Sequence, residues 1–420
     1  MRTKTMTAAL ATAAMVLACS SKETPSHPEN DAGADGSPGT FTPPPKDPGA
    51  GAILFTASGE SLALSGYAFP PASPGDPAFV DGWEVKLEHL IATIDKLTLS
   101  EGPDTAPGDP SKTGKLVAEV DGPFAVDLAV DGPGNIDGAG DPGTRAVPIA
   151  ALTKQNRNGD APFATDGTRY AFGFDVVAAA ANAQNVNLSG DANDAYKEMT
   201  ADGCTVLYVG TATFKGTSCT PAVSDADSGA DAGSDEFAKL PKIVKFRLCF
   251  KSPTSYLNCQ NGLNDPAEAL PGESHQRGIA FKANTFVLGQ VTIHTDHPFW
   301  ESTEHDSPAH FDTLAAQAVG KSDATVTLDA LKGVDIEGWT DAQGASLPWR
   351  SCLPADQYTP PGTGTMRFDA HGVAIVGPNG DPSKGLRDAY DFVTYNQSTQ
   401  GHLNIEDGLC FVARHYPSPP

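Results

Sequence analysis

Histidine is concentrated in one short stretch of the chain, "IHTDHPFWESTEHDSPAHFD", which spans residues 293–312. The stretch holds four of the ten histidines, with aspartate and glutamate between them: His294, His297, His305 and His310. Neutral imidazoles and carboxylates bind zinc or copper in proteins, and no pair of cysteines has the CxxC spacing of a thiolate site. The residue types therefore predict a transition-metal site for copper or zinc. The alternative is a polar surface loop whose aromatic residues pack on the domain.

His294 and His297 are the leading candidates, because both lie where a strand is expected to end. His294 follows the apolar run "NTFVLGQVTI", and His297 comes just before Pro298, which takes the chain out of the strand. Two imidazoles at this spacing are able to converge on one ion.

Three other histidines are supporting candidates. His305 lies in the loop that follows, and His310 is expected in the first turn of a helix that starts at Ser307. His89 occupies the apolar side of the alternating pattern "GWEVKLEHLIATIDKLTL". There it is either a hydrogen-bonded core histidine or, if that strand faces the loop, an additional ligand.

Enzyme motifs are missing from the sequence. It contains no GxSxG, no P-loop, no GxGxxG that leads from a strand into a helix and no HExxH. Acidic residues are so frequent that neighbouring carboxylates carry no information about catalysis. The sequence therefore favours a binding protein over an enzyme.

Strand-like runs separated by turn-rich loops make up most of the chain. They lie at residues 82–99, 115–120, 124–130, 169–177, 204–214, 242–250, 284–294, 324–331 and 408–416. Helical signals are few: one at residues 307–320, with Ser307 as N-cap and Pro308 in the first turn, and one at residues 193–200. This pattern predicts a mainly β protein, an antiparallel β-sandwich with long loop insertions and one or two short helices.

The N-terminus indicates export. Residues 1–19 combine Arg2 and Lys4 with an apolar run and end in "VLAC", like a bacterial lipoprotein signal peptide, so Cys19 is the expected site of lipid attachment. Residues 20–52 are rich in proline, glycine and acidic residues and predict a disordered spacer. A β-rich domain is expected over residues 53–420, interrupted by a disordered acidic insert at about 222–236.

Six further cysteines predict disulfides, because an exported chain folds in an oxidising compartment. Six cysteines allow fifteen pairings, so the sequence does not settle the connectivity. Proximity along the chain favours Cys204–Cys219 and Cys249–Cys259, which leaves Cys352 with Cys410.

The formal net charge of −24 limits the partners of this protein. Such a chain repels nucleic acid and anionic lipid surfaces and attracts cations. The expected partners are the membrane through the N-terminal lipid, a metal ion and an envelope protein, but no nucleic acid.

Three segments carry a resemblance to a known family: "DGWEVKLEHLIATIDKLTL", "RYAFGFDVV" and "TIHTDHPFW". They resemble the periplasmic copper-binding proteins associated with methanobactin uptake, and a wider group of uncharacterised exported bacterial lipoproteins. The resemblance implies a β-rich fold that binds copper through histidines beside an oxidisable tryptophan. It would make His294 and His297 ligands and either Trp300 or Trp83 the neighbouring indole, although each tryptophan has the alternative role of a hydrophobic anchor.

Together these features predict a lipid-anchored protein of the cell envelope, an outer-membrane lipoprotein facing the periplasm or the cell surface. Its function would be to bind copper or zinc through the histidine cluster, without catalysis. The alternative is a structural or interaction module of the cell surface that holds no metal.

Overall fold

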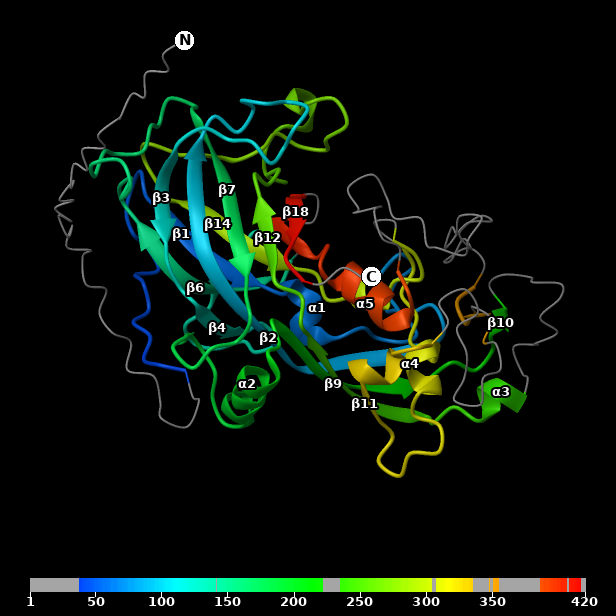
Figure 1. Ribbon diagram of the computed structural model, residues 1–420. Helices are drawn as coiled ribbons and strands as arrows, with labels where there is room; N and C mark the ends of the chain where they lie inside the picture. The colour runs from blue at the N-terminus through cyan, green and yellow to red at the C-terminus, as the bar shows by residue number, and fades with distance from the viewer. Residues whose placement is uncertain are drawn as a thin grey trace, which may run out of the picture.

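The computed structural model of the chain is shown in Figure 1. It describes residues 38–140, 142–221, 235–303, 307–334, 347, 350–354, 386–405 and 408–416. The expected signal peptide with Cys19, most of the spacer, most of the acidic insert and His305 lie outside these residues, so the expectations about them stay predictions. In the part of the chain that is described, no helix is long and apolar enough to cross a membrane.

The larger of two main sheets has eleven strands. Its central path runs β15-β11-β9-β2-β7-β12-β18, and β2 also pairs with β3 and β4. In Figure 1 the long, curved β2 connects the upper strands to β9 and β11. The strands are β2 (Trp83–Glu101), β3 (Leu116–Val120), β4 (Phe124–Asp127), β7 (Arg169–Val176), β8 (Gln184–Asn185), β9 (Val206–Phe214), β11 (Ile243–Phe250), β12 (Thr254–Leu257), β13 (Ile279–Ala280), β15 (Thr325–Thr327) and β18 (Phe411–Arg414).

The smaller sheet has five strands in the order β17-β14-β1-β6-β5. Its strands are β1 (Ile53–Ser58), β5 (Ile136–Asp137), β6 (Arg145–Leu152), β14 (Val287–Ile293) and β17 (Gly401–Leu403). A separate pair consists of β10 (Thr220–Pro221) and β16 (Arg350–Ser351).

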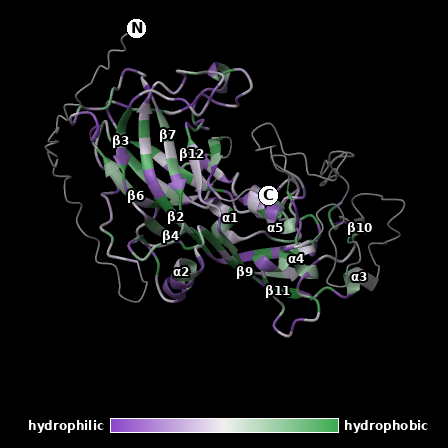
Figure 2. Cartoon of the chain, in the orientation of Figure 1, coloured by the Kyte–Doolittle hydropathy of each residue, from purple (hydrophilic) through white to green (hydrophobic). Residues whose placement is uncertain are grey.

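The two sheets pack face to face around one core. Phe55 of β1 stacks on Phe172 of β7 with ring centroids 6.1 Å apart, and Tyr256 of β12 lies directly against Gly401 of β17. Figure 2 shows hydrophobic residues concentrated in the strands and many hydrophilic ones in the connecting loops. The prediction of a mainly β, sandwich-like fold with long loops is therefore confirmed.

The prediction that all strands run antiparallel needs correction, because the sheets are mixed. β1 pairs in parallel with β14, β4 with β8, and β11 with β15. A parallel pair requires a long crossover connection. Alternating residues show which face of a strand is buried but not the direction of its neighbour, so the direction of pairing cannot be read from a local pattern.

Helices are short and more numerous than expected. Among the described residues they are α1 (Glu60–Ser65), α2 (Asp191–Asp202), α3 (Asp235–Ala238), α4 (Asp312–Ala316), α5 (Ala389–Gln397) and the 3₁₀ turns η1 (Pro266–Glu268), η2 (His297–Phe299) and η3 (Leu328–Leu331). The helix expected at residues 193–200 is confirmed as α2. The helix expected from Ser307 begins only at Asp312, because Ala309 forms β-bridges to Phe79 and Trp300 and holds the preceding residues extended.

All three expected disulfide pairs are wrong. The bonds are Cys204–Cys249, Cys219–Cys352 and Cys259–Cys410. Each bond lies at the end of a pair of neighbouring strands. The first links Cys249 in β11 to Cys204 just before β9, near the pair Val206 and Phe250, and the others lie beside the pairs β10–β16 and β12–β18. Strand pairing, and not proximity in sequence, decides which thiols meet. Three disulfides indicate an oxidising, extracytoplasmic environment.

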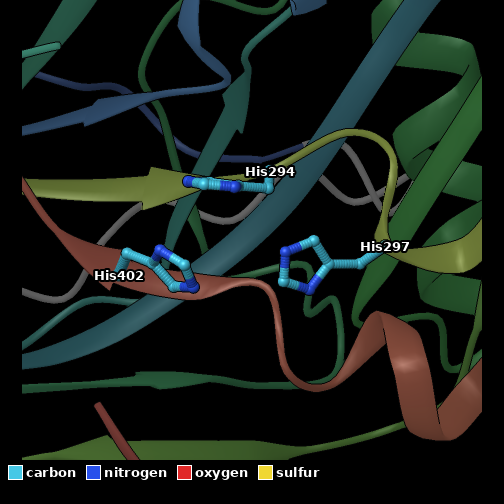
Figure 3. A group of neighbouring side chains, drawn as sticks. All are labelled: His294, His297 and His402. Carbon is cyan, nitrogen blue, oxygen red and sulfur yellow. The ribbon is translucent and has the colours of Figure 1, made fainter. Parts of the chain in front are cut away.

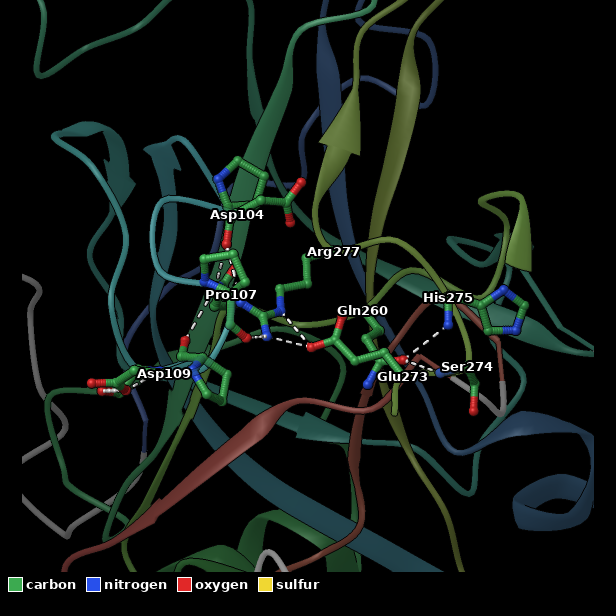
Figure 4. A network of polar contacts seen from close by, with 12 residues as sticks. Asp104, Pro107, Asp109, Gln260, Glu273, Ser274, His275 and Arg277 are labelled. Atoms are coloured by element: carbon green, nitrogen blue, oxygen red, sulfur yellow. Dashed lines mark hydrogen bonds and ion pairs between the residues drawn. The ribbon is translucent and has the colours of Figure 1, made fainter. Parts of the chain in front are cut away.

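A buried arginine fixes the loops at one end of the larger sheet. Arg277 is 2% exposed, and its guanidinium donates to the carbonyls of Pro103 and Pro107 at 3.3 and 3.2 Å and to the carboxylate of Glu273. Figure 4 shows this network of polar contacts between the loops. Arg277 thus satisfies loop carbonyls that burial would otherwise leave unpaired.

Candidate metal centre

Three histidines from two distant parts of the sequence meet at one end of the smaller sheet: His294, His297 and His402. Each offers one ring nitrogen, and these nitrogens all lie within 4.8 Å of one another. The residues are 7%, 0% and 0% exposed, and Figure 3 shows their rings gathered around a common point. The arrangement has the donor type and spacing to hold a metal ion.

Strand pairing brings His294 and His402 together. Thr292 of β14 pairs directly with His402 of the antiparallel β17. Side chains alternate between the faces of a strand, so His294, two residues beyond Thr292, projects from the same face as His402. The backbone N–H of His294 also donates to the carbonyl of Gln400 at 3.3 Å. The ring centroids of His294 and His402 lie 4.2 Å apart.

His297 enters the site from the turn after β14. It begins η2, with Pro298 in the first position after it, and its ring centroid lies 5.2 Å from that of His294 and 5.7 Å from that of His402. The helix α5 packs on η2. The turn therefore supplies the third imidazole and α5 holds it in place.

A hydroxyl at the end of α5 sets the tautomer of His297. Nδ1 of His297 lies 2.8 Å from Oγ1 of Thr399, and that hydroxyl donates its own proton to the carbonyl of Asn396 at 2.7 Å. Oγ1 must therefore accept from Nδ1–H of His297. The proton on Nδ1 makes Nε2 the nitrogen with a lone pair, and thus the ligand atom.

Trp300 covers the site from one side. Its ring stacks on that of His297 with centroids 3.7 Å apart and an interplanar angle of 29°, and its Nε1 donates to Asp296 at 3.0 Å. Trp83, the other tryptophan singled out in the sequence, instead donates to Asp312 at 2.8 Å. Only Trp300 of these two is thus in contact with the histidines of the triad.

The surroundings of the triad carry negative charge. Oε1 of Glu60 lies 3.6 Å from Nε2 of His294. Burial raises the pKa of Tyr67 well above its ordinary value, and the charges of Asp296 and Glu60 raise it further. The pKa of Tyr208 is raised by burial and by Asp296 in the same way. Carboxylates in a buried environment of this kind favour a cation.

His310 lies outside the triad, in a second buried polar cluster. Its Nε2 contacts Glu301 and its Nδ1 lies 3.7 Å from Asp81. Burial alone would lower the pKa of His310, but the charge of Glu301 and the contact with Asp81 outweigh it and raise the pKa to about 9. His310 is therefore an imidazolium that joins two carboxylates at neutral pH.

Asp312 and Arg350 extend this second cluster. Arg350 donates to Asp312 through Nε and Nη2 at 2.5 and 2.6 Å. Burial and the charge of Asp81 raise the pKa of Asp312 to about 7, against the opposing effect of Arg350. These contacts hold α4 in place, and Phe299 of η2 and Phe311 just before α4 both pack on Phe246 of β11.

His89 does not join the triad, and His305 lies outside the described residues. Nδ1 of His89 lies 2.7 Å from Asp127 and its Nε2 lies 3.4 Å from Asp191, and the hydrogen bond to Asp127 raises its pKa. His89 is thus hydrogen-bonded by carboxylates, the first of the two roles considered for it. A further group formed by Asp202, Cys204 and Cys249 lacks free thiols, because its cysteines form a disulfide.

Sequence reasoning missed His402, although its ring lies nearest to that of His294. No other histidine lies near it in the sequence "QGHLNIEDG". Local clustering of histidines, which singled out the other candidates, therefore could not reveal it. Only the pairing of β14 with β17 reveals its proximity.

No protein-family model, no curated protein and no solved structure matches this chain.

Proposed function

We propose that this protein is a lipid-anchored protein of the cell envelope that binds one copper or zinc ion at the triad of His294, His297 and His402. The observation that carries the proposal is the convergence of three buried imidazole nitrogens within 4.8 Å. The signal-like N-terminus with Cys19 supports the anchor, and the disulfides support an envelope location.

The chemistry of the donors limits the choice of metal. Imidazole nitrogen suits zinc and copper, whereas calcium and magnesium require oxygen ligands. The histidines are almost fully buried, and a buried site favours retention of the ion over turnover of a substrate at it. The function would therefore be metal binding or metal delivery.

Metal analysis of purified protein tests the proposal. After incubation with copper or zinc and gel filtration, the chain without residues 1–19 is expected to retain about one ion per molecule, as a single three-imidazole site requires. His294→Ala and His402→Ala should each lose most of the bound metal. His415→Ala is the matched control, because His415 is exposed and bonds to Ser255.

Two outcomes would contradict the proposal. One is wild-type protein that emerges from gel filtration without copper or zinc. The other is a pair of triad variants that retain as much metal as His415→Ala.

A further inference from the structure

A tyrosine of the larger sheet reaches across the core to the metal centre. Tyr208 lies in the middle of β9, where it pairs with Leu90 of β2 on one side and with Leu248 of β11 on the other. The residue is 0% exposed. A residue that is paired on both sides and close-packed has little freedom to move. Tyr208 therefore provides a fixed point opposite the smaller sheet.

The hydroxyl of Tyr208 connects the two strands that carry His294 and His402. It donates to Oε1 of Gln400 at 2.6 Å, and it lies 3.3 Å from the carbonyl oxygen of His294. The carbonyl of Gln400 in turn accepts from the backbone N–H of His294 at 3.3 Å. One hydroxyl thus joins the end of β14 to the residue two positions before His402 in β17.

The ring of Tyr208 contacts the turn that carries the third histidine. Its centroid lies 6.4 Å from that of Phe299, with an angle of 79° between the two rings. Phe299 is the last residue of η2, which begins at His297. Edge-to-face pairs of this kind favour a defined orientation of the two rings. Through its hydroxyl and its ring, Tyr208 is therefore connected to the supports of all three imidazoles.

Burial makes the hydrogen bond between Tyr208 and Gln400 important for the geometry of the site. Gln400 is also 0% exposed, and a buried polar group that loses its partner pays the full cost of its desolvation. Ligands on separate strands must be held within about 0.5 Å of the productive geometry. A bond that fixes β14 relative to β17 thus bears directly on the distance between two of the ligands.

We infer that Tyr208 is a positioning residue of the metal centre, which holds the three histidines of the triad in the relative positions that one ion requires. This inference rests on the proposed function of the triad. Groups that orient metal ligands typically contribute about 10- to 100-fold to metal affinity, because they fix the ligands before the ion arrives. The hydroxyl carries this role, since it is the group that joins β14 to β17.

Tyr208→Phe tests the role, because it keeps the ring and removes only the hydroxyl. It should weaken Zn²⁺ and Cu²⁺ binding by about 10-fold or more. It should also change the electron paramagnetic resonance spectrum of the Cu²⁺ form, which reports on the arrangement of the nitrogen donors. Competition titrations against a chelator of known affinity measure the loss.

Tyr196→Phe is the matched control. Tyr196 is 0% exposed, and its hydroxyl donates to the carbonyl of Ala180 at 3.2 Å, in the separate hydrophobic cluster around α2. Both variants lose one buried hydroxyl, so both should lose a similar amount of thermal stability. Only Tyr208→Phe should lose metal affinity and change the Cu²⁺ spectrum.

A double-mutant cycle with Gln400→Met shows whether the hydroxyl acts through Gln400. Residues that share one hydrogen bond give losses that do not add, so Tyr208→Phe should reduce affinity less in the Gln400→Met protein than in the wild type. Additive losses would overturn the positioning role. So would an affinity and a spectrum of Tyr208→Phe that match those of Tyr196→Phe while His402→Ala is impaired. Absence of metal from the wild type would overturn the proposed function as well.

Discussion

At the scale of single residues, Thr399 decides which nitrogen of His297 faces the other imidazoles. Its hydroxyl donates to the carbonyl of Asn396 and so must accept the proton on Nδ1 of His297. A partner of this kind fixes both the tautomer and the orientation of a ligating ring.

Thr399→Val is therefore expected to weaken metal binding by about 10- to 100-fold, because the side chain keeps its shape but loses the hydroxyl. Thr399→Ser retains the hydroxyl and should bind metal like the wild type. Competition against a chelator of known affinity measures the difference. Equal affinity of the valine and serine variants would refute the orienting role.

The charge on His310 should make stability depend on pH. The pKa of His310 is raised from 6.5 to about 9 in the folded protein. The charged ring therefore stabilises the folded state fully below about pH 6.5, and this contribution is lost as the pH rises through about 9. The loss is of the order of a few kcal/mol, since one pKa unit corresponds to ~1.4 kcal/mol.

Urea unfolding of the metal-free protein between these two pH values measures this effect. The free energy of unfolding should fall across the range in the wild type and in His415→Gln, and much less in His310→Gln. A wild-type slope that His310→Gln leaves unaltered would show that other groups cause the pH dependence.

At the scale of elements, the site depends on three neighbouring strands, β1, β14 and β17. β17 carries His402 and packs against the larger sheet, where a Cβ on Gly401 would lie 2.5 Å from the ring of Tyr256. Tyr256 is 1% exposed and therefore has little room to move. The close approach of β17 to β12 thus determines where the imidazole of His402 lies.

Gly401→Ala is expected to displace β17, with a loss of roughly 1–3 kcal/mol of stability and weaker metal binding. Gly134→Ala is the control, because a Cβ at Gly134 meets no atom within 4 Å. Thermal unfolding and metal titration of both variants test this. A Gly401→Ala protein as stable and as metal-competent as Gly134→Ala would mean that the packing at β17 is not tight.

At the scale of the whole molecule, disulfides close long loops between paired strands. Cys204 and Cys249 are separated by 45 positions, and Cys259 and Cys410 by 151. Such bonds restrict the unfolded chain and so stabilise the folded one. The bond between Cys259 and Cys410 also fixes β18 beside β12.

Replacing Cys204 and Cys249 together by alanine is expected to lower the free energy of unfolding by about 4 kcal/mol on the chain-entropy estimate. Urea unfolding measures the loss. Peptide mapping of the unreduced wild type should first recover Cys204 with Cys249. A peptide that joins Cys204 to Cys219 would contradict the connectivity.

The sequence by itself predicted the mainly β class, nine of the strands, the helix at α2 and the pair His294 and His297, because alternation of apolar residues and local clustering are properties of neighbouring positions. Each strand-like run contains a strand in the structure. His294 and His297 are three residues apart at the end of β14, so they must lie close together in space. This is why these two residues of the site could be predicted.

Only the tertiary structure decided the partners of those residues. His402 and Glu60 reach His294 through strands that pair with β14 from distant parts of the chain, and the same kind of pairing selected the disulfides. His310 and His89 instead contact buried carboxylates, those of Glu301 and Asp127. Pairing between distant strands depends on burial of the whole core and leaves no local pattern, so no short stretch of sequence encodes it.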